Sequence, residues 1–162
     1  MRNIQELLDE NQKNWFKLLT IVGRNNLKEQ MILQYLESNG WEICDVEEKI
    51  FELSDIIPPE KIKLRIGTEI KKWVKSLGPK MVFVNTNILY SEDLGKVGPY
   101  GLFKYHMRGK KEGVIFIEAR LKVNLAIYSS PNRDDYNETE LEDVVYIDLD
   151  EVLIPGDEND SN

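Results

Sequence analysis

The segment from Phe16 to Leu36 has the layout of a phosphate-binding loop, but its charged groups are changed. An apolar run ends at Gly23, a polar turn follows, and a helical pattern then begins. In the pattern G-x-x-x-x-G-K-[ST], backbone N–H groups surround phosphates, while the lysine and the hydroxyl neutralise charge and hold magnesium. Counting from Gly23 places Lys28 at the second glycine. Glu29 then takes the lysine position and Gln30 the hydroxyl position. A carboxylate repels a triphosphate. The segment therefore keeps the strand–loop–helix order of a phosphate-binding loop but should not bind nucleotide in the usual way.

The second half of such a site is an aspartate at the end of another apolar strand, where it organises the magnesium shell. Here the apolar run Met81–Val84 ends in Asn85, and Asn87 follows two residues later. An amide can hydrogen-bond in place of a carboxylate, but it brings no charge to a metal and cannot act as a base. The lysine, the hydroxyl and both acidic positions are therefore lost together.

Several polar residues of the first loop remain candidates for binding an anion. Their side chains, together with the N-terminus of the following helix, could hold a phosphate group. The alternative is a solvated turn, with Asn85 and Asn87 only capping the end of a strand. The candidates in the loop are Gly23, Arg24, Asn25, Asn26 and Lys28.

The surrounding pattern predicts strands and helices in alternation. Expected strands are Lys17–Val22, Trp41–Val46, Met81–Val84, Gly113–Ala119, Val123–Ser129 and Val144–Leu149, with the fourth and fifth paired across Arg120–Lys122. Expected helices are an N-terminal one with Ile4, Leu7, Leu8 and Trp15 on one stripe, Leu27–Asn39, one or two turns in Glu47–Leu53, a long helix between Pro58 and Gly78, and a partly helical segment from Ile88 to Lys111.

This order predicts an α/β, three-layer fold like that of P-loop NTPases, with a mostly parallel sheet. A single small domain is expected over residues 1–154. Residues 155–162 form an acidic tail that we predict to be disordered.

Composition limits the chemistry further. Cys44 and His106 are the only residues of their kinds in the 162-residue chain, which excludes a disulfide framework, a cysteine zinc site and most histidine metal sites. The acidic group Asp134, Asp135 and Glu138 has no evident companion ligands, so no metal is predicted. The polar N-terminus does not read as a signal peptide, and no apolar run approaches membrane length. We therefore expect a cytoplasmic location and no membrane partner.

The net charge of −8 is unevenly distributed. Among residues 131–162, Arg133 is the single basic residue against twelve Asp and Glu, so the rest of the chain is mildly basic. Basic clusters of this kind either contact phosphate backbones or form solvated faces. The two clusters are Lys61, Lys63, Arg65, Lys71, Lys72 and Lys75, and then Lys104, Arg108, Lys110 and Lys111.

The order of these motifs resembles the BrxF family, the small P-loop proteins of BREX phage-defence systems. The matching stretches are IVGRNNLKEQMIL, FELSDIIPPEK, FVNTNILY and HMRGKKEGVIFIEARLKVNLAIYSSPNRDDY, in the family's order and spacing over Leu18–Tyr136. The resemblance implies that Gly23 is the first loop glycine, that Asn85 stands at the magnesium-organising aspartate and that Arg108 matches a helix arginine directed at a γ-phosphate. Glu29 and Gln30 depart from the family pattern.

Three hypotheses follow. The first is a non-catalytic P-loop-like subunit, without a cofactor, that contacts other subunits of a phage-defence complex. The second is an atypical NTPase that binds ATP and magnesium, with Lys28 as a displaced phosphate lysine and Arg108 or a partner's arginine as the finger; it requires Lys28 to point into the loop. The third is a DNA-binding accessory domain that uses the basic clusters. In the first hypothesis, contact with DNA is expected to be indirect.

Overall fold

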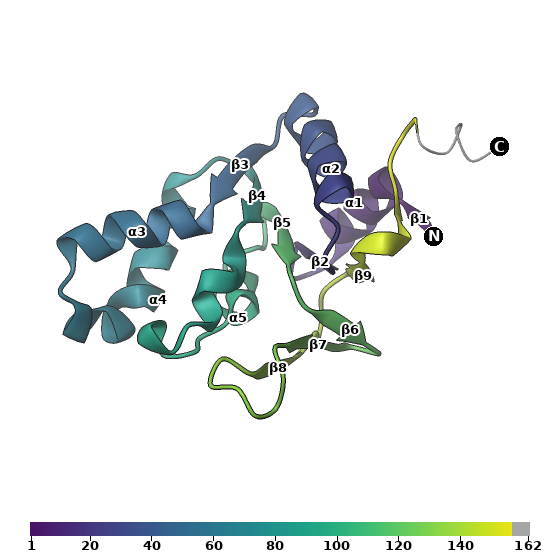
Figure 1. Cartoon of the computed structure of the whole chain (residues 1–162). Helices are drawn as coiled ribbons and strands as arrows, with labels where there is room; N and C mark the ends of the chain where they lie inside the picture. Colours follow the sequence, from purple (N-terminus) through teal and green to yellow (C-terminus); the bar gives the residue numbers. More distant parts are fainter. Residues whose placement is uncertain (157–162) are drawn as a thin grey trace.

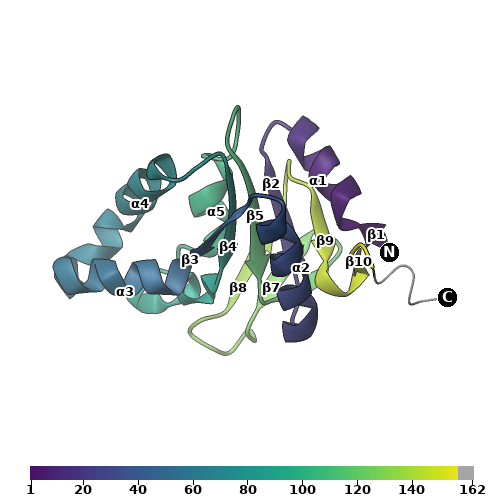
Figure 2. The ribbon, with the colours of Figure 1, turned by 90° about the horizontal axis from the view of Figure 1, so that it is seen from above.

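The centre of the molecule is a five-stranded sheet in which all four pairs of neighbouring strands are parallel (Figures 1 and 2). The computed structural model describes residues 1–156. The strand order is β3-β4-β5-β2-β9. The bounds are β2 Leu18–Val22, β3 Glu42–Asp45, β4 Lys80–Val84, β5 Glu112–Ile117 and β9 Tyr146–Asp148. The predicted α/β class with a mostly parallel sheet is confirmed.

The three central strands are apolar because helices cover both of their faces. All five residues of β2 are buried, as are the last four of β4 and the last five of β5. One apolar cluster joins the sheet to α1 (Ile4–Lys13) and α2 (Asn26–Ser38). The other joins the opposite face to α3 (Val46–Ile56), α4 (Pro59–Ser76) and α5 (Pro99–Lys104). The sheet therefore lies between two layers of helices.

Polar caps fix where the helices next to the sheet begin. Asn3, Asn25 and Asp45 each accept a backbone N–H bond at the start of α1, α2 and α3. Pro59 opens α4 at a position where its missing N–H costs nothing. Asn25 is the third residue after β2 and Asp45 is the last residue of β3, so the connections from these strands into helices are short.

The predicted pairing of Gly113–Ala119 with Val123–Ser129 is wrong. β5 lies in the middle of the main sheet between β4 and β2, because its continuous apolar sequence must be buried on both faces. The residues expected to form the turn are themselves strand β6 (Arg120–Lys122). β6 pairs antiparallel with β7 (Leu125–Tyr128), which pairs with β8 (Asn137–Glu140) in a separate small sheet.

Other differences are local. Trp15 lies outside α1 with 70% of its surface exposed, and Leu27 is 74% exposed on α2, so neither belongs to the core.

α3 is longer than predicted, and the partly helical segment consists of two short 3₁₀ helices, Thr86–Tyr90 and Glu92–Leu94, followed by α5. A further 3₁₀ helix, Leu149–Glu151, leads to β10 (Val152–Leu153), which pairs with β1 (Arg2–Asn3). The predicted tail lies outside the described residues except for Pro155 and Gly156.

Candidate functional site

A cavity of about 210 Å³ lies where the strands of the main sheet end. The chain leaves the adjacent strands β2 and β5 in opposite directions, since β2 leads to β3 at one edge and β5 leads to β9 at the other. In open α/β sheets, ligands bind in the crevice that such a reversal creates at the carboxyl ends of the strands. The lining residues are Gly23, Arg24, Asn25, Asn26, Glu29, Glu47, Asn85, Thr86, Asn87, Ile88, Phe116, Glu118 and Leu149.

Gly23 is held between β5 and the 3₁₀ helix that follows β9. Its N–H donates to the carbonyl oxygen of Ile117 at 3.0 Å, so this donor is already satisfied. Its φ of +152° lies in a region that favours glycine. A Cβ atom at this position would lie 2.8 Å from the Cβ of Leu149. A requirement for close packing against Leu149 therefore accounts for this glycine without any phosphate.

The polar groups after Gly23 are bound to the chain itself. The Asn25 carboxamide oxygen accepts from the Lys28 N–H at 3.1 Å, and its Nδ2 donates to the Asp150 carboxylate at 3.2 Å. The Lys28 ammonium donates to the Asp150 carbonyl oxygen at 2.8 Å. Lys28 therefore points toward the 3₁₀ helix Leu149–Glu151, and it is absent from the residues that line the cavity.

The opposite wall of the cavity follows β4, and its side chains link three strand ends. Asn85 has a left-handed backbone, φ 52°, and its Nδ2 donates to the Asp45 carboxylate at 2.9 Å. Asn87 and Glu118 form a reciprocal pair, in which the Asn87 side chain donates to the Glu118 carbonyl at 3.0 Å and accepts from the Glu118 N–H at 3.2 Å. The two asparagine side chains can donate and accept hydrogen bonds, and here they tie neighbouring strand ends together.

The cavity carries an excess of negative charge. Among the described residues, Glu29, Glu47 and Glu118 line it against one guanidinium, that of Arg24. Arg24 is itself paired with Glu118, at 3.2 Å from Nε to Oε1. Burial, with a smaller contribution from the charge of Glu118, raises the pKa of Glu29 above its ordinary value. The same negative charges would repel a phosphate group placed in the cavity.

The structure brings most of the predicted site residues together. Gly23, Arg24, Asn25, Asn26 and Asn85 all line the cavity.

Arg108 lies at the other end of the sheet from this cavity. It follows Met107, whose carbonyl oxygen accepts from the N–H of Lys17, immediately before β2 begins. Arg108 is therefore near the amino ends of the strands, while the cavity is at their carboxyl ends.

Sequence reasoning missed three acidic residues around the loop: Glu47, Glu118 and Asp150. A signal for Glu118 was available, because it directly follows the apolar run of β5. Asp150 carried no such signal, since its contact with the loop depends on the pairing of β9 beside β2.

A second cavity of about 420 Å³ shares Arg24, Asn87 and Glu118 with the first and extends along β7 to Arg120 and Arg133.

Two lysines of the second basic cluster have internal roles. Lys104 is only 5% exposed, and its ammonium lies 5.0 to 5.3 Å from the ring centroids of Phe16, Tyr100 and Tyr105. Lys111 donates to the carbonyl oxygens of Val74, Leu77 and Gly78 at the end of α4. These two side chains are therefore not part of a solvated basic face.

Within residues 1–156, no group of three or more His, Cys, Asp or Glu side chains is placed to hold a metal ion. Asp135 instead accepts hydrogen bonds from Ser129, at 2.6 Å, and from Arg133, at 3.2 Å. In the same described part of the chain, no helix combines the length and the apolar character needed to cross a membrane.

Comparison with protein-family models, with curated proteins and with solved structures found no match to this chain.

Proposed function

We propose that this chain is a P-loop-like α/β subunit without nucleotide chemistry, which works through contacts with other proteins. The observation that carries the proposal is the bond from the Lys28 ammonium to the Asp150 carbonyl oxygen, because it directs the lysine nearest to the loop away from the cavity.

Three features support descent from a phosphate-binding site. A glycine loop joins a buried parallel strand to a helix, and the residue in the magnesium-organising position, Asn85, lines the same cavity. The cavity lies at the switch point of the sheet, where nucleotide-binding α/β proteins hold their ligands.

Three features oppose phosphate binding in the present site. Only Gly23, Arg24 and Asn25 separate β2 from α2, which is shorter than the loop of a P-loop motif. The N–H of Gly23 and the side chain of Asn25 have partners within the chain. The carboxylates of the cavity add an unfavourable potential for an anion.

The setting of this subunit rests on the resemblance in sequence alone. On that basis we propose that the partners are other subunits of a BREX-like phage-defence assembly.

The atypical NTPase of the second hypothesis requires Lys28 to turn into the cavity and to give up its bond to Asp150.

Calorimetric titration of the full chain with ATP and magnesium tests the loss of nucleotide chemistry. We expect binding weaker than about 1 mM, with no difference between the wild type and Lys28→Ala. Lys110→Ala, which removes an exposed lysine at the other end of the sheet, serves as the matched control. Micromolar binding that is lost in Lys28→Ala and kept in Lys110→Ala would contradict the proposal and favour the atypical NTPase.

One observation favours the DNA-binding alternative. Lys71, Lys75 and Arg108 act together on His106, so the basic residues of α4 and of the loop before β5 are close in space. A duplex held there would show an affinity that falls steeply with salt, since each phosphate contact releases a counterion. Affinity for a 20-base-pair duplex measured between 50 and 200 mM salt separates this alternative from the main proposal, which expects no salt-dependent binding of DNA.

A further inference from the structure

Strand β3 leaves one edge of the main sheet open. β3 has a single neighbour, β4, in the strand order, and no other described strand pairs with its outer side. On an edge strand, alternate backbone N–H and C=O groups point away from the sheet and can pair with an added strand. Two of its four residues, Glu42 and Ile43, are exposed. Glu42–Asp45 therefore offer a short template for another extended chain.

A groove of about 190 Å³ runs beside this edge. All four residues of β3 form one wall, and the other walls come from α3 and from the last turns of α4. Trp73 and Leu77 give the groove an apolar part next to the strand. An added strand would therefore find both backbone partners and a surface for its side chains. The other lining residues are Glu48, Lys49 and Glu52 of α3, Trp73 of α4, and Leu77, which directly follows α4.

The groove is acidic. Four carboxylates line it, from Glu42, Asp45, Glu48 and Glu52, against one ammonium, that of Lys49. Lys49 already lies over the ring of Trp73, with its Nζ 5.9 Å from the ring centroid. The carboxylates therefore favour an incoming cation, and the Trp73 ring already makes a cation–π contact within the chain.

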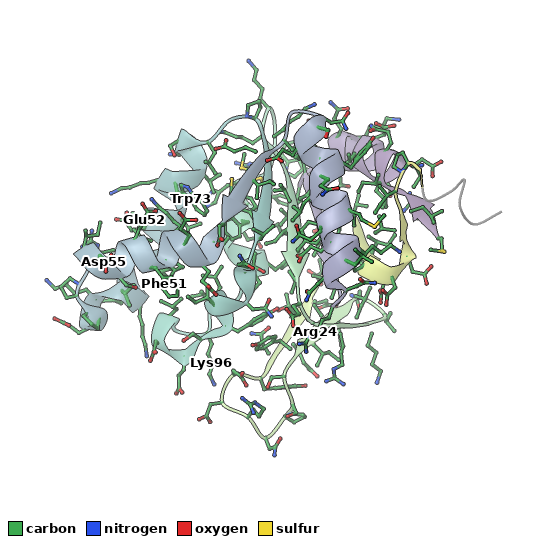
Figure 3. The ribbon with its side chains drawn as sticks, turned by 45° about the horizontal axis from the view of Figure 1, so that its top comes forward. Arg24, Phe51, Glu52, Asp55, Trp73 and Lys96 are labelled. Carbon is green, nitrogen blue, oxygen red and sulfur yellow. The ribbon has the colours of Figure 1, made fainter. Side chains whose placement is uncertain are left out.

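The side of α3 next to the groove also carries acidic side chains. Glu48, Phe51, Glu52 and Asp55 have the i, i+3, i+4, i+7 spacing of one helical face. Phe51 is 58% exposed on the same helix, but it does not line the groove. Figure 3 shows Phe51, Glu52 and Asp55 along α3, with Trp73 on the Glu52 side.

We propose that β3 and this groove dock an extended segment of a partner protein that adds to the sheet as a strand and places Lys or Arg side chains among the carboxylates. The inference rests on the proposed function, because it names the surface and the class of partner for a subunit that works through protein contacts. Nucleic acid does not fit this surface, since its phosphates would face four carboxylates.

A titration of the ¹⁵N-labelled full chain with a capped seven-residue peptide of alternating Lys and Val tests the proposal. Backbone amide signals of Glu42–Asp45 and the indole N–H signal of Trp73 should shift. The same peptide with Glu in place of Lys should bind at least about tenfold more weakly, because its charge is reversed. Binding of the basic peptide that leaves these signals unchanged, or no binding at millimolar peptide, would overturn the proposal.

Pairing through the backbone is separated from simple charge attraction by N-methylation. Two further peptides keep the Lys-Val sequence and carry N-methyl groups on one or the other set of alternate residues. Because only one edge of the added strand faces β3, one set should weaken binding by about tenfold while the other leaves it nearly unchanged. Equal binding of all three peptides would show an unspecific ionic contact and would overturn strand addition.

Charge at the groove is tested in the protein itself. The double variant Glu48→Lys/Glu52→Lys should bind the basic peptide at least about tenfold more weakly. The matched double variant Glu6→Lys/Glu37→Lys, with the same change of charge on α1 and α2, should stay within about twofold. Equal loss in both variants would contradict the assignment to this groove.

Sedimentation of the chain without peptide supplies the last control. Self-association that shifts the signals of Glu42–Asp45 would make a second copy of this chain the occupant and would overturn the partner class. Peptide binding and ATP binding are measured at different signals and sites, so failure of this inference and failure of the proposed function are distinguishable.

Discussion

The side-chain ammonium of Lys28 donates a hydrogen bond to the backbone carbonyl oxygen of Asp150, at 2.8 Å. The bond joins the first turns of α2 to the 3₁₀ helix after β9, two segments that are 122 residues apart in sequence. The carboxylate of the same Asp150 accepts from the side chain of Asn25. The polar groups that would meet a phosphate in a working loop therefore fasten the C-terminal part of the fold to β2 and α2.

We predict that Lys28→Met lowers the free energy of unfolding by about 1 kcal/mol, because a charge-assisted bond to a backbone carbonyl is lost while the apolar stem of the side chain is kept. Urea denaturation measures the change. Lys13→Met, at the end of α1, serves as the control and should change stability by less than about 0.5 kcal/mol. Equal effects of the two substitutions would show that the Lys28 bond contributes nothing to stability.

The tight packing of Gly23 gives a second prediction. Gly23→Ala should destabilise the chain by about 2 kcal/mol, because the new Cβ would lie 2.8 Å from the Cβ of Leu149 and the backbone has φ +152°. Gly67→Ala, in the middle of α4 with open space around its Cβ, should instead stabilise by about 0.5–1 kcal/mol. Thermal and urea unfolding of the two variants would disprove this account if both changes had the same sign.

Periodicity and apolar runs predict most of the elements of this fold, because burial determines both. The runs that became β2, β3, β4 and β9 and the stripe of α4 are visible in the sequence. The place of β5 is not, because a fully apolar strand suits any central position and the short spacing to the next strand favours a hairpin. Trp15 and Leu27 show the same limit, since a residue that fits an apolar stripe can still lie where nothing covers it.

The candidate site is predictable to a similar extent. Residues that follow parallel strands, such as Gly23 and Asn85, are expected together at the carboxyl ends of those strands, and both line the cavity. The direction of a long side chain is a different matter. Lys28 and Lys111 look like exposed cations in the sequence, and their carbonyl partners become visible only when β9 and α4 are in place.

The half-buried carboxyl of Glu29 predicts a pH-dependent effect. Its pKa is raised in the folded chain by burial and then by the charge of Glu118, so the stability that its protonated form provides is present below the unfolded value of 4.5 and is lost as the pH rises through the folded value. Glu29→Gln, which stays neutral, should therefore melt at a higher temperature than the wild type at pH 7. The gain should vanish below pH 4.5.

A matched substitution on the same helix controls for this prediction. Glu37→Gln removes an exposed carboxylate of α2 and should leave the melting temperature nearly unchanged at both pH values. A gain for Glu29→Gln that persists undiminished in acid would mean that shape or hydrogen bonding is responsible, and not charge.

Lys111 should contribute to stability through the end of α4. Its ammonium donates to the carbonyl oxygens of Val74, in the last turn of α4, and of Leu77 and Gly78, which follow the helix. We expect Lys111→Met to cost about 1–2 kcal/mol in urea denaturation. Lys110→Met, at the neighbouring exposed residue, should cost less than about 0.5 kcal/mol. If the two variants were equally stable, capping by Lys111 would be refuted.

The environment of His106 predicts both a shifted titration and its dependence on salt. Burial is the largest cause that lowers its pKa below 6.5, and Lys71, Lys75 and Arg108 lower it further. The unfolded chain therefore takes up this proton first as the pH falls, so the contribution of His106 to stability is complete above pH 6.5 and is lost between 6.5 and the folded value.

NMR titration of the imidazole measures this pKa directly. Lys75→Gln should raise it toward 6.5, and so should added salt, because screening weakens the repulsion between exposed charges. Lys72→Gln is the matched control, since Lys72 lies on the same helix but is paired with Glu69 at 3.7 Å and is not among the charges that act on His106. A pKa that stays the same in 50 mM and 500 mM salt would show that burial alone sets it, and would remove the observation that favours DNA binding at this end of the sheet.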